Sequence, residues 1–227
     1  MNPTHGVFMS VRAVIFDLDE TLIHSKIDFK KMKERVITFL ESVGVTEGLL
    51  NTNMLNMEIT RLAVEDLHRR GLSEEEIRSI LAGVTKIMNR TELESLVGAK
   101  PIEGAKETLK ALKERGLKIG VMTRSCHEYA ERALTKFGLR AYVDAISARD
   151  DVEEPKPSPI HARHMMGLLG VKACETVLVG DHWLDGLCAK EAGLRCILVL
   201  RRNLNLEMLE GYDYRIARSI REITRMI

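Results

Sequence analysis

Acidic residues follow directly after an apolar segment near the start of the chain. In the stretch VRAVIFDLDETLIHS, the apolar residues 13–16 lead into Asp17, Asp19 and Glu20. In an extended backbone the side chains of residues i and i+2 project to the same side, so Asp17 and Asp19 are expected to share one site. Two carboxylates this close repel each other unless a cation joins them or one of them carries a proton. Because strands also commonly end in polar residues, the pair alone does not decide between chemistry and a simple strand end.

Two further apolar segments end in a polar residue. The segment LKIGVMT ends at Thr123, and the segment TVLVGD ends at Asp181. If these segments are parallel strands, their carboxyl ends meet at one edge of the sheet, where ligands bind in open α/β folds. The oxygen-only set of Asp17, Asp19 and Asp181 suits Mg²⁺. Such a cation shields the charge of a phosphate, so that an anionic carboxylate can attack phosphorus.

Two other charged residues fit the same site. Lys156 lies between two prolines in EPKPSP, which restrict the backbone and favour a fixed positive charge near a phosphate; the alternative is a surface lysine in a loop. Asp185 follows Asp181 by four residues in GDHWLDG. We expect one of these two carboxylates to hold the metal and the other to orient a metal-bound water or Lys156. An acidic residue in the first turn of a helix is an equally good interpretation of Asp185.

Hydrophobic spacing divides the chain into an α/β part and an all-helical part. From residue 100 onward, apolar strand segments alternate with helical patterns, which predicts a doubly wound parallel sheet. Residues 28 to about 96 show only helical spacing and are interpreted as an insertion. We therefore expect an α/β core formed by residues 1–24 and 99–227 and a helical domain formed by residues 25–98.

Three predicted helices begin with recognisable capping residues. Ser73 with Glu76, and Ser125 with Glu128, have the spacing of capping boxes. Ser158, which a proline follows, suits the N-cap position of a third helix.

Composition excludes several classes of protein. The net charge is +1, from 34 basic and 33 acidic residues, and no run of Lys and Arg indicates a nucleic-acid partner. No apolar run reaches the roughly 18 residues of a membrane span, and residues 1–10 lack the pattern of a secretion signal. The four cysteines form no CxxC pair and are expected to be reduced thiols. We expect a cytoplasmic protein without a nucleic-acid or membrane partner.

The motifs, taken as an ordered set, resemble those of the haloacid dehalogenase (HAD) superfamily. DLDET matches the first motif of that superfamily, DxDx(T/V), and GDHWLD matches the fourth, GDxxxD. Thr123 matches the second motif and Lys156 the third, and order and spacing match over residues 11–227. The resemblance implies a Rossmann-like α/β core with a helical cap, as in phosphoglycolate phosphatase-like enzymes. Closure of that cap, with hinges at residues 24–28 and 98–101, would exclude bulk water.

The resemblance also implies a catalytic role for four motif residues. Asp17 would be the nucleophile that becomes an aspartyl-phosphate, and Asp19 would be the acid and base. Thr123 would donate a hydrogen bond to the phosphoryl oxygens. Lys156 would balance the negative charge around Asp17 and the phosphate.

The metal ligands that the resemblance implies all offer oxygen atoms to Mg²⁺. They are Asp17, the main-chain carbonyl of Asp19, and Asp181, with Asp185 in support.

Residues beside the motifs are candidates for contact with the substrate. Arg124 follows Thr123 where the superfamily commonly has Asn or Ser; it either reaches a second anionic group of the substrate or makes an outward salt bridge. His24, just after the first motif, is a further candidate substrate-binding residue. The bulky pair His182 and Trp183 is interpreted as narrowing the mouth of the pocket.

These observations predict a Mg²⁺-dependent phosphatase that hydrolyses a phosphate monoester of a small metabolite, either a phosphoglycolate-like acid or a sugar phosphate. A sugar-phosphate mutase of the same superfamily shares all four motifs and stays open, as does a non-catalytic small-molecule-binding protein with this fold. A dehalogenase needs no metal and is not expected to carry an aspartate at position 19. A phosphonate hydrolase would need a lysine in an apolar pocket of the cap, which the sequence does not indicate. A monomer or a homodimer is expected.

Overall fold

The chain divides into two compact units in the computed structural model, which describes residues 10–200 and 206–227. The first unit, Met1–Ser25 with Ala99–Ile227, is called the α/β unit, and the second, Lys26–Gly98, is called the helical unit. The predicted absence of a secretion signal concerns a segment of which residues 1–9 lie outside the described part. Within the described residues, no helix combines the length and the apolar character needed to cross a membrane.

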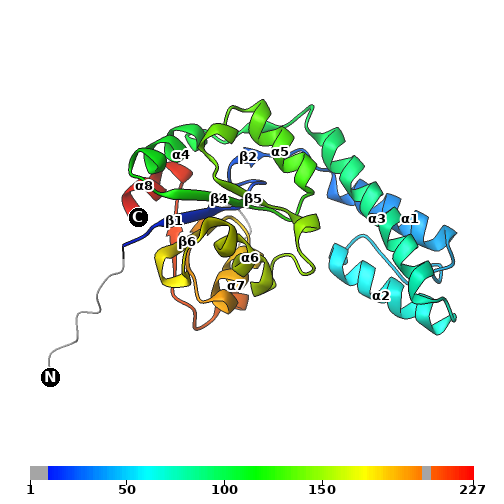
Figure 1. Ribbon diagram of the computed structural model, residues 1–227. Coiled ribbons are helices and arrows are strands. Elements are labelled where there is room, and N and C mark those ends of the chain that lie inside the picture. Colours follow the sequence, from blue (N-terminus) through cyan, green and yellow to red (C-terminus); the bar gives the residue numbers. More distant parts are fainter. Residues whose placement is uncertain (1–9, 201–205) are drawn as a thin grey trace, which may run out of the picture. The chain divides into compact units, whose positions relative to one another are not determined.

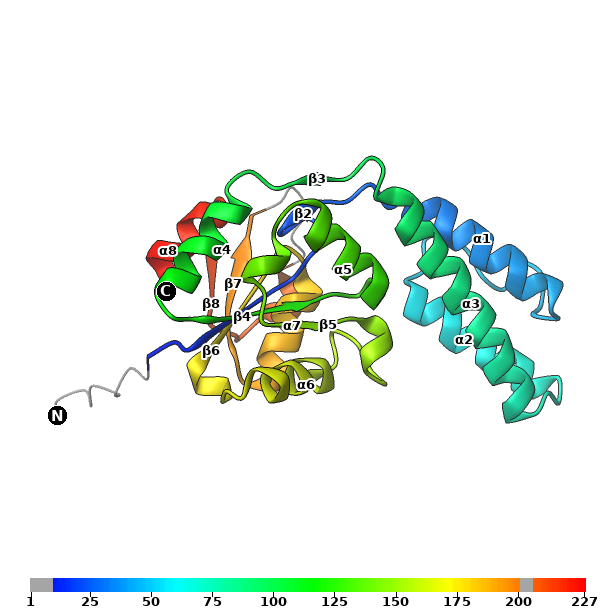
Figure 2. The same cartoon turned by 45° about the horizontal axis from the view of Figure 1, so that its top comes forward.

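The α/β unit contains a six-stranded parallel sheet with the strand order β5-β4-β1-β6-β7-β8. Figure 1 shows α4, α5 and α8 on one face of this sheet and α6 and α7 on the other, and Figure 2 shows the same layers after rotation. The predicted α/β class with a doubly wound parallel sheet is therefore confirmed. The strands are β1 (Ala13–Phe16), β4 (Lys118–Met122), β5 (Ala145–Ser147), β6 (Thr176–Gly180), β7 (Arg195–Val199) and β8 (Tyr214–Ala217). The helices of this unit are α4 (Ala105–Glu114), α5 (His127–Lys136), α6 (Pro159–Leu169), α7 (Trp183–Ala192) and α8 (Ile223–Met226).

The central strands are apolar because helices cover them on both faces. All four residues of β1 are fully buried, and every residue of β6 is buried as well. A strand that is buried on both faces has no solvent side for polar residues, so its sequence is a continuous apolar run. β1 lies between β4 and β6. The polar residues that follow these three strands are consequently neighbours at one edge of the sheet.

The helical unit has a hydrophobic core of its own. It consists of α1 (Phe29–Ser42), α2 (Asn56–Arg69) and α3 (Glu74–Ser95). Apolar residues at helical spacing on all three helices and on the loop between α1 and α2 form this core: Val36, Leu40, Val45, Leu50, Ile59, Ala63, Leu67, Ile77 and Val84. This agrees with the all-helical pattern read from the sequence.

Two of the three predicted helix starts are confirmed and one is wrong. Ser73 and Glu76 form the predicted capping box of α3, and Ser158 is the N-cap of α6. The predicted capping box at Ser125 does not form, because α5 begins at His127 and its N-cap residue is Cys126. Tertiary structure overrides the local capping signal here, since the Ser125 hydroxyl binds elsewhere.

Short elements account for the other differences from the predicted pattern. The end of the chain forms a 3-10 turn, η5 (Ile220–Glu222), followed by the single turn of α8. β2 (Ile23–His24) and β3 (Lys100–Pro101) pair in antiparallel fashion and are too short to show a sequence pattern. All four cysteines are free thiols. The remaining 3-10 turns are η1 (Arg140–Tyr142), η2 (Arg149–Asp151), η3 (Ala173–Glu175) and η4 (Glu207–Leu209).

The space around two glycines, Gly120 and Gly167, shows that α6 packs tightly on the sheet and is open on its outer side. A Cβ atom at Gly120 in β4 would lie 2.5 Å from the Met165 sulfur and 3.1 Å from Leu169 Cδ1, whereas a Cβ at Gly167 in α6 would meet no atom within 4 Å. We expect Gly120→Ala to lower the free energy of unfolding by about 1–3 kcal/mol through overpacking. The control Gly167→Ala should raise it by up to about 1 kcal/mol, because alanine favours a helix more than glycine does. Urea unfolding followed by circular dichroism measures both, and equal effects of the two changes would contradict this account of the packing.

Candidate active site

Three polar residues follow the three central strands at the same edge of the sheet. Asp17 follows β1, Thr123 follows β4 and Asp181 follows β6. The register keeps them within one residue of each other, since Phe16 pairs with Val121 on one side and with Val179 on the other, which places Thr123 and Asp181 one residue beyond Asp17. Parallel strands thus deliver these side chains to one crevice, where open α/β sheets bind their ligands.

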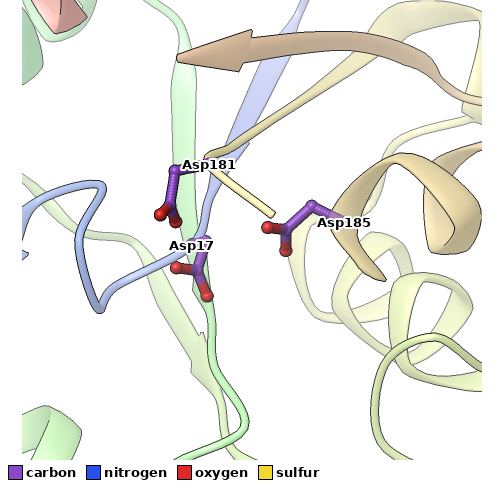
Figure 3. Close-up of side chains that lie close together, drawn as sticks. All are labelled: Asp17, Asp181 and Asp185. Carbon is purple, nitrogen blue, oxygen red and sulfur yellow. The ribbon is translucent and has the colours of Figure 1, made fainter. Parts of the chain in front are cut away.

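Three carboxylates form a compact acidic cluster at this edge. Oxygen atoms of Asp17, Asp181 and Asp185 all lie within 4.8 Å of one another, and Figure 3 shows the three side chains converging from β1, the end of β6 and the start of α7. Gly180 makes the approach of Asp185 possible. A Cβ atom at Gly180 would lie 2.3 Å from the carboxyl carbon of Asp185, so any larger residue would displace that carboxylate.

A buried ammonium group bridges two members of the cluster. Lys156 is only 1% exposed, and its Nζ lies 2.5 Å from Asp17 Oδ1 and 2.6 Å from Asp185 Oδ1. The interpretation of Lys156 as a surface lysine is therefore wrong. Burial by itself lowers the pKa of the Lys156 amine, but the charges of Asp17 and Asp185 outweigh it and raise that pKa above its usual value. The lysine is thus held as a fixed positive charge.

The cluster carries more negative than positive charge. Burial raises the pKa of Asp17 well above the usual range of a carboxyl group; the charge of Lys156 opposes this, and the neighbouring carboxylates raise it further. Three carboxylates around one ammonium group therefore leave a net negative charge at this edge of the sheet. An all-oxygen donor set of this kind fits a hard divalent cation such as Mg²⁺, which would relieve the repulsion that raises the pKa of Asp17.

The Asp19 carboxylate does not join this cluster. Its Oδ2 accepts hydrogen bonds from the hydroxyl groups of Ser125 (2.8 Å) and Thr123 (3.3 Å), and its Oδ1 accepts one from the hydroxyl of Tyr129 (2.9 Å). The backbone does not stay extended after Asp17, because the chain bends at Leu18. It then turns at Glu20, which has a φ of 60°. The expectation that Asp17 and Asp19 present their carboxylates to one cation is therefore corrected, and only the main-chain carbonyl of Asp19 stays a predicted ligand.

Thr21, the threonine of the first motif, has a partner that the sequence did not indicate, and two residues beside the motifs received no site role from the sequence. The hydroxyl of Thr21 donates to Asp181 Oδ1 at 3.1 Å, so this threonine orients a cluster carboxylate. Ser125 and Tyr129 hold Asp19 through their hydroxyl groups. A signal for these two exists in the sequence: both follow Thr123 within six residues, so they belong to the segment that leaves the same edge of the sheet.

The remaining predicted residues lie around the cluster and not in it. The side chain of His24 is exposed, and its Nδ1 lies 3.0 Å from Oε2 of Glu20, the third acidic residue of the first motif. Arg124 Nη1 donates to the main-chain carbonyl of Lys156, so Arg124 faces the site and the outward salt bridge is wrong. His182 is the N-cap of α7, where its Nδ1 accepts a hydrogen bond from the main chain. Its main-chain N–H donates to Asp185 Oδ2 at 3.1 Å.

Comparison with known proteins identifies the class to which this fold and site belong. Residues 14–199 match the family model described as haloacid dehalogenase-like hydrolase. The chain belongs to this family, and the resemblance read from its four motifs is confirmed.

Individual relatives fall within the same class. The chain is 34% identical to a protein named Pyrophosphatase PpaX from Halalkalibacterium halodurans over 192 residues, which cover 84% of each chain. It is 29% identical to a phosphoglycolate phosphatase from Yersinia pseudotuberculosis, over 84% of this chain and 81% of the other. The crystal structure of a HAD-superfamily hydrolase from Geobacter sulfurreducens has the same fold, with a TM-score of 0.60, 20% identity and coverage of 96% of this chain and all of the other.

The acidic cluster generates a prediction about metal affinity. We expect Asp181→Asn to weaken Mg²⁺ binding by about tenfold or more, because it removes one charged oxygen ligand from the set. Isothermal titration calorimetry with MgCl₂ measures this affinity without any turnover. The matched control is Asp213→Asn, which changes an aspartate outside the cluster and should leave the affinity as it is. Equal binding by the wild type and Asp181→Asn would remove Asp181 from the ligand set.

Proposed function

We propose that the protein is a Mg²⁺-dependent phosphatase that hydrolyses a phosphate monoester of a small metabolite through an aspartyl-phosphate. One observation carries the proposal: the buried Asp17 carboxylate contacts Lys156 beside Asp181 and Asp185, in a chain of the haloacid dehalogenase-like hydrolase family. A scaffold protein has no need of this costly arrangement, because removing charged groups from water costs free energy that pairing often does not repay. This disfavours the alternative of a non-catalytic binding protein.

Asp17 would act as the nucleophile in the first half of the reaction. Its carboxylate oxygen would attack phosphorus while the bond from phosphorus to the leaving oxygen breaks, and Asp19 would give that oxygen a proton. The Thr123 hydroxyl would donate to the phosphoryl oxygens. Lys156 would keep Asp17 ionised and aligned, since its ammonium already binds the same carboxylate.

Water would complete the reaction in the second half. A water molecule would attack the phosphorus of the aspartyl-phosphate, Asp19 would take its proton, and inorganic phosphate and free Asp17 would result. Asp17, Asp181 and the main-chain carbonyl of Asp19 would hold Mg²⁺, with Asp185 holding Lys156. The cation would supply charge neutralisation, so that the carboxylate and the phosphate can approach each other.

The relatives suggest which substrates to test first. Phosphoglycolate and sugar phosphates stay the predicted class, and inorganic pyrophosphate is a second candidate because the 34% identical relative is named a pyrophosphatase. A panel of these compounds with a phosphate-release assay ranks them by kcat/KM. A sugar-phosphate mutase would instead return an isomerised sugar phosphate and little free phosphate.

Three further expectations from the sequence stay predictions: a cytoplasmic location, a monomeric or dimeric state, and a capping role for the helical unit.

The nucleophile is tested with p-nitrophenyl phosphate in the presence and absence of Mg²⁺. We expect turnover that requires the cation, and loss of turnover in Asp17→Asn, because an amide is a far weaker nucleophile than a carboxylate. Circular dichroism should report a folded variant, and Asp213→Asn serves as the active control. Turnover of Asp17→Asn near the wild-type rate would refute the assignment, and wild-type protein without Mg²⁺-dependent turnover on any phosphate ester would refute the function.

The role of Asp19 is tested separately from that of Asp17. Asp19→Asn should bind Mg²⁺ nearly as the wild type does, because the predicted ligand is the main-chain carbonyl of this residue. The amide cannot take a proton from water, so we expect one rapid release of p-nitrophenolate followed by a stalled phosphoenzyme. Stopped-flow absorbance and intact-protein mass spectrometry detect the two. Steady turnover of this variant at the wild-type rate would contradict the acid and base role.

A further inference from the structure

His161 is a buried residue near the site that none of the four motifs includes. It lies in α6, five residues after Lys156, and is completely buried. Its Nδ1 lies 3.1 Å from the main-chain nitrogen of Lys156, and its Nε2 lies 3.1 Å from the main-chain carbonyl oxygen of Ser147. A main-chain N–H only donates, so Nδ1 accepts. Nε2 therefore carries the hydrogen and donates to Ser147.

The imidazole keeps this state at neutral pH. Burial lowers the pKa of His161 to about 3, with the charge of Lys156 acting in the same direction. A neutral ring with a fixed tautomer can join two main-chain groups, since one nitrogen accepts a hydrogen bond and the other donates one.

The Ser147 carbonyl connects His161 to the edge of the sheet at which Asp17, Thr123 and Asp181 lie. The same oxygen accepts a hydrogen bond from the main-chain nitrogen of Thr123 at 3.0 Å. His161 therefore links the end of β5, and through it the residue after β4, to the loop that carries Lys156.

Side chains hold both polar groups of the Lys156 main chain. His161 accepts from its N–H, and Arg124 donates to its carbonyl oxygen. The flanking residues Pro155 and Pro157 have no N–H of their own to donate. These two side chains therefore anchor the loop at the lysine itself, where the ammonium must bridge Asp17 and Asp185.

We propose that His161 is a positioning residue that fixes the Lys156 main chain, so that the ammonium stays between Asp17 and Asp185. Arg124 performs the complementary task on the carbonyl side. The effect on turnover rests on the proposed phosphatase function, whereas the placement of the lysine does not. An error of about 1 Å in the placement of a catalytic group lowers the rate by about a hundredfold, so a side chain that never touches the substrate can still limit kcat.

The test compares two substitutions on the same helix. His161→Phe fills a similar volume but removes both hydrogen bonds. The matched control is His164→Phe, because His164 also binds Ser147, through the serine hydroxyl at 2.9 Å. Two quantities are measured in the Mg²⁺-containing protein: the rate at which an amine-specific acylating reagent labels Lys156, by peptide mass spectrometry, and the kcat and KM for p-nitrophenyl phosphate.

We expect His161→Phe to speed the labelling of Lys156 by about tenfold and to lower kcat by about 10- to 100-fold, with a smaller change in KM. His164→Phe should match the wild type in both quantities. His161→Asn retains an acceptor for the Lys156 N–H and should recover part of the loss. If His161→Phe does not fold, His161→Asn and Arg124→Met are compared with the control in the same way, with faster labelling and lower kcat expected for both.

The labelling rate of Lys156 and kcat distinguish the positioning role of His161 from the phosphatase function. Unchanged labelling and unchanged kcat in the His161 variants of an active enzyme would overturn the positioning role. Equally fast labelling in His164→Phe would overturn it too, since the effect would then be a general loosening of α6. Wild-type protein without phosphatase activity, combined with faster labelling only in the His161 variants, would support the positioning role and refute the proposed function.

Discussion

The buried ammonium of Lys156, placed between the carboxylates of Asp17 and Asp185, is the interaction on which the site depends. Without it, two carboxylates would face each other in a region from which solvent is excluded. Breaking a buried ion pair by removing one partner costs on the order of 3–5 kcal/mol, because it leaves an unpaired charge behind. The surroundings are built to keep this contact. Gly180 leaves room for Asp185. His161 accepts a hydrogen bond from the main-chain N–H of Lys156, and Arg124 donates one to its main-chain carbonyl.

The turn after β1 separates two aspartates that are only two positions apart. Asp17 faces the acidic cluster, whereas the Asp19 carboxylate accepts hydrogen bonds from three hydroxyl groups on the segment after β4 and on α5. The first environment is crowded with charge, and the second offers three hydroxyl donors. One short motif thus presents two carboxylates to different partners, which suits the division between a nucleophile and an acid or base that we propose.

Much of this arrangement could be predicted from local pattern. Continuous apolar runs identified the central strands, because burial on both faces leaves no position for a polar residue. Parallel strands place their carboxyl ends together, so the order of residues along the chain suffices to assign Asp17, Thr123 and Asp181 to one edge. Prediction failed where a side chain had a distant partner. Ser125 has the spacing of a helix cap, yet its hydroxyl binds Asp19, which is 106 positions away in the chain. The extended backbone assumed for Asp17 and Asp19 failed because the chain bends at Leu18, between the two aspartates.

The sequence by itself determined the fold class, the all-helical insertion and the identity of the acidic and basic residues at the edge of the sheet. These follow from hydrophobic periodicity and residue type, which act over a few positions of the chain. Only the tertiary structure decided how the charges are paired and which neutral side chains support them. Lys156 reaches Asp17 across 139 positions of the chain, and His161 binds a carbonyl group on another strand. Such contacts depend on distances in space that no local spacing encodes, since hydrogen bonds and ion pairs act only over a few ångströms.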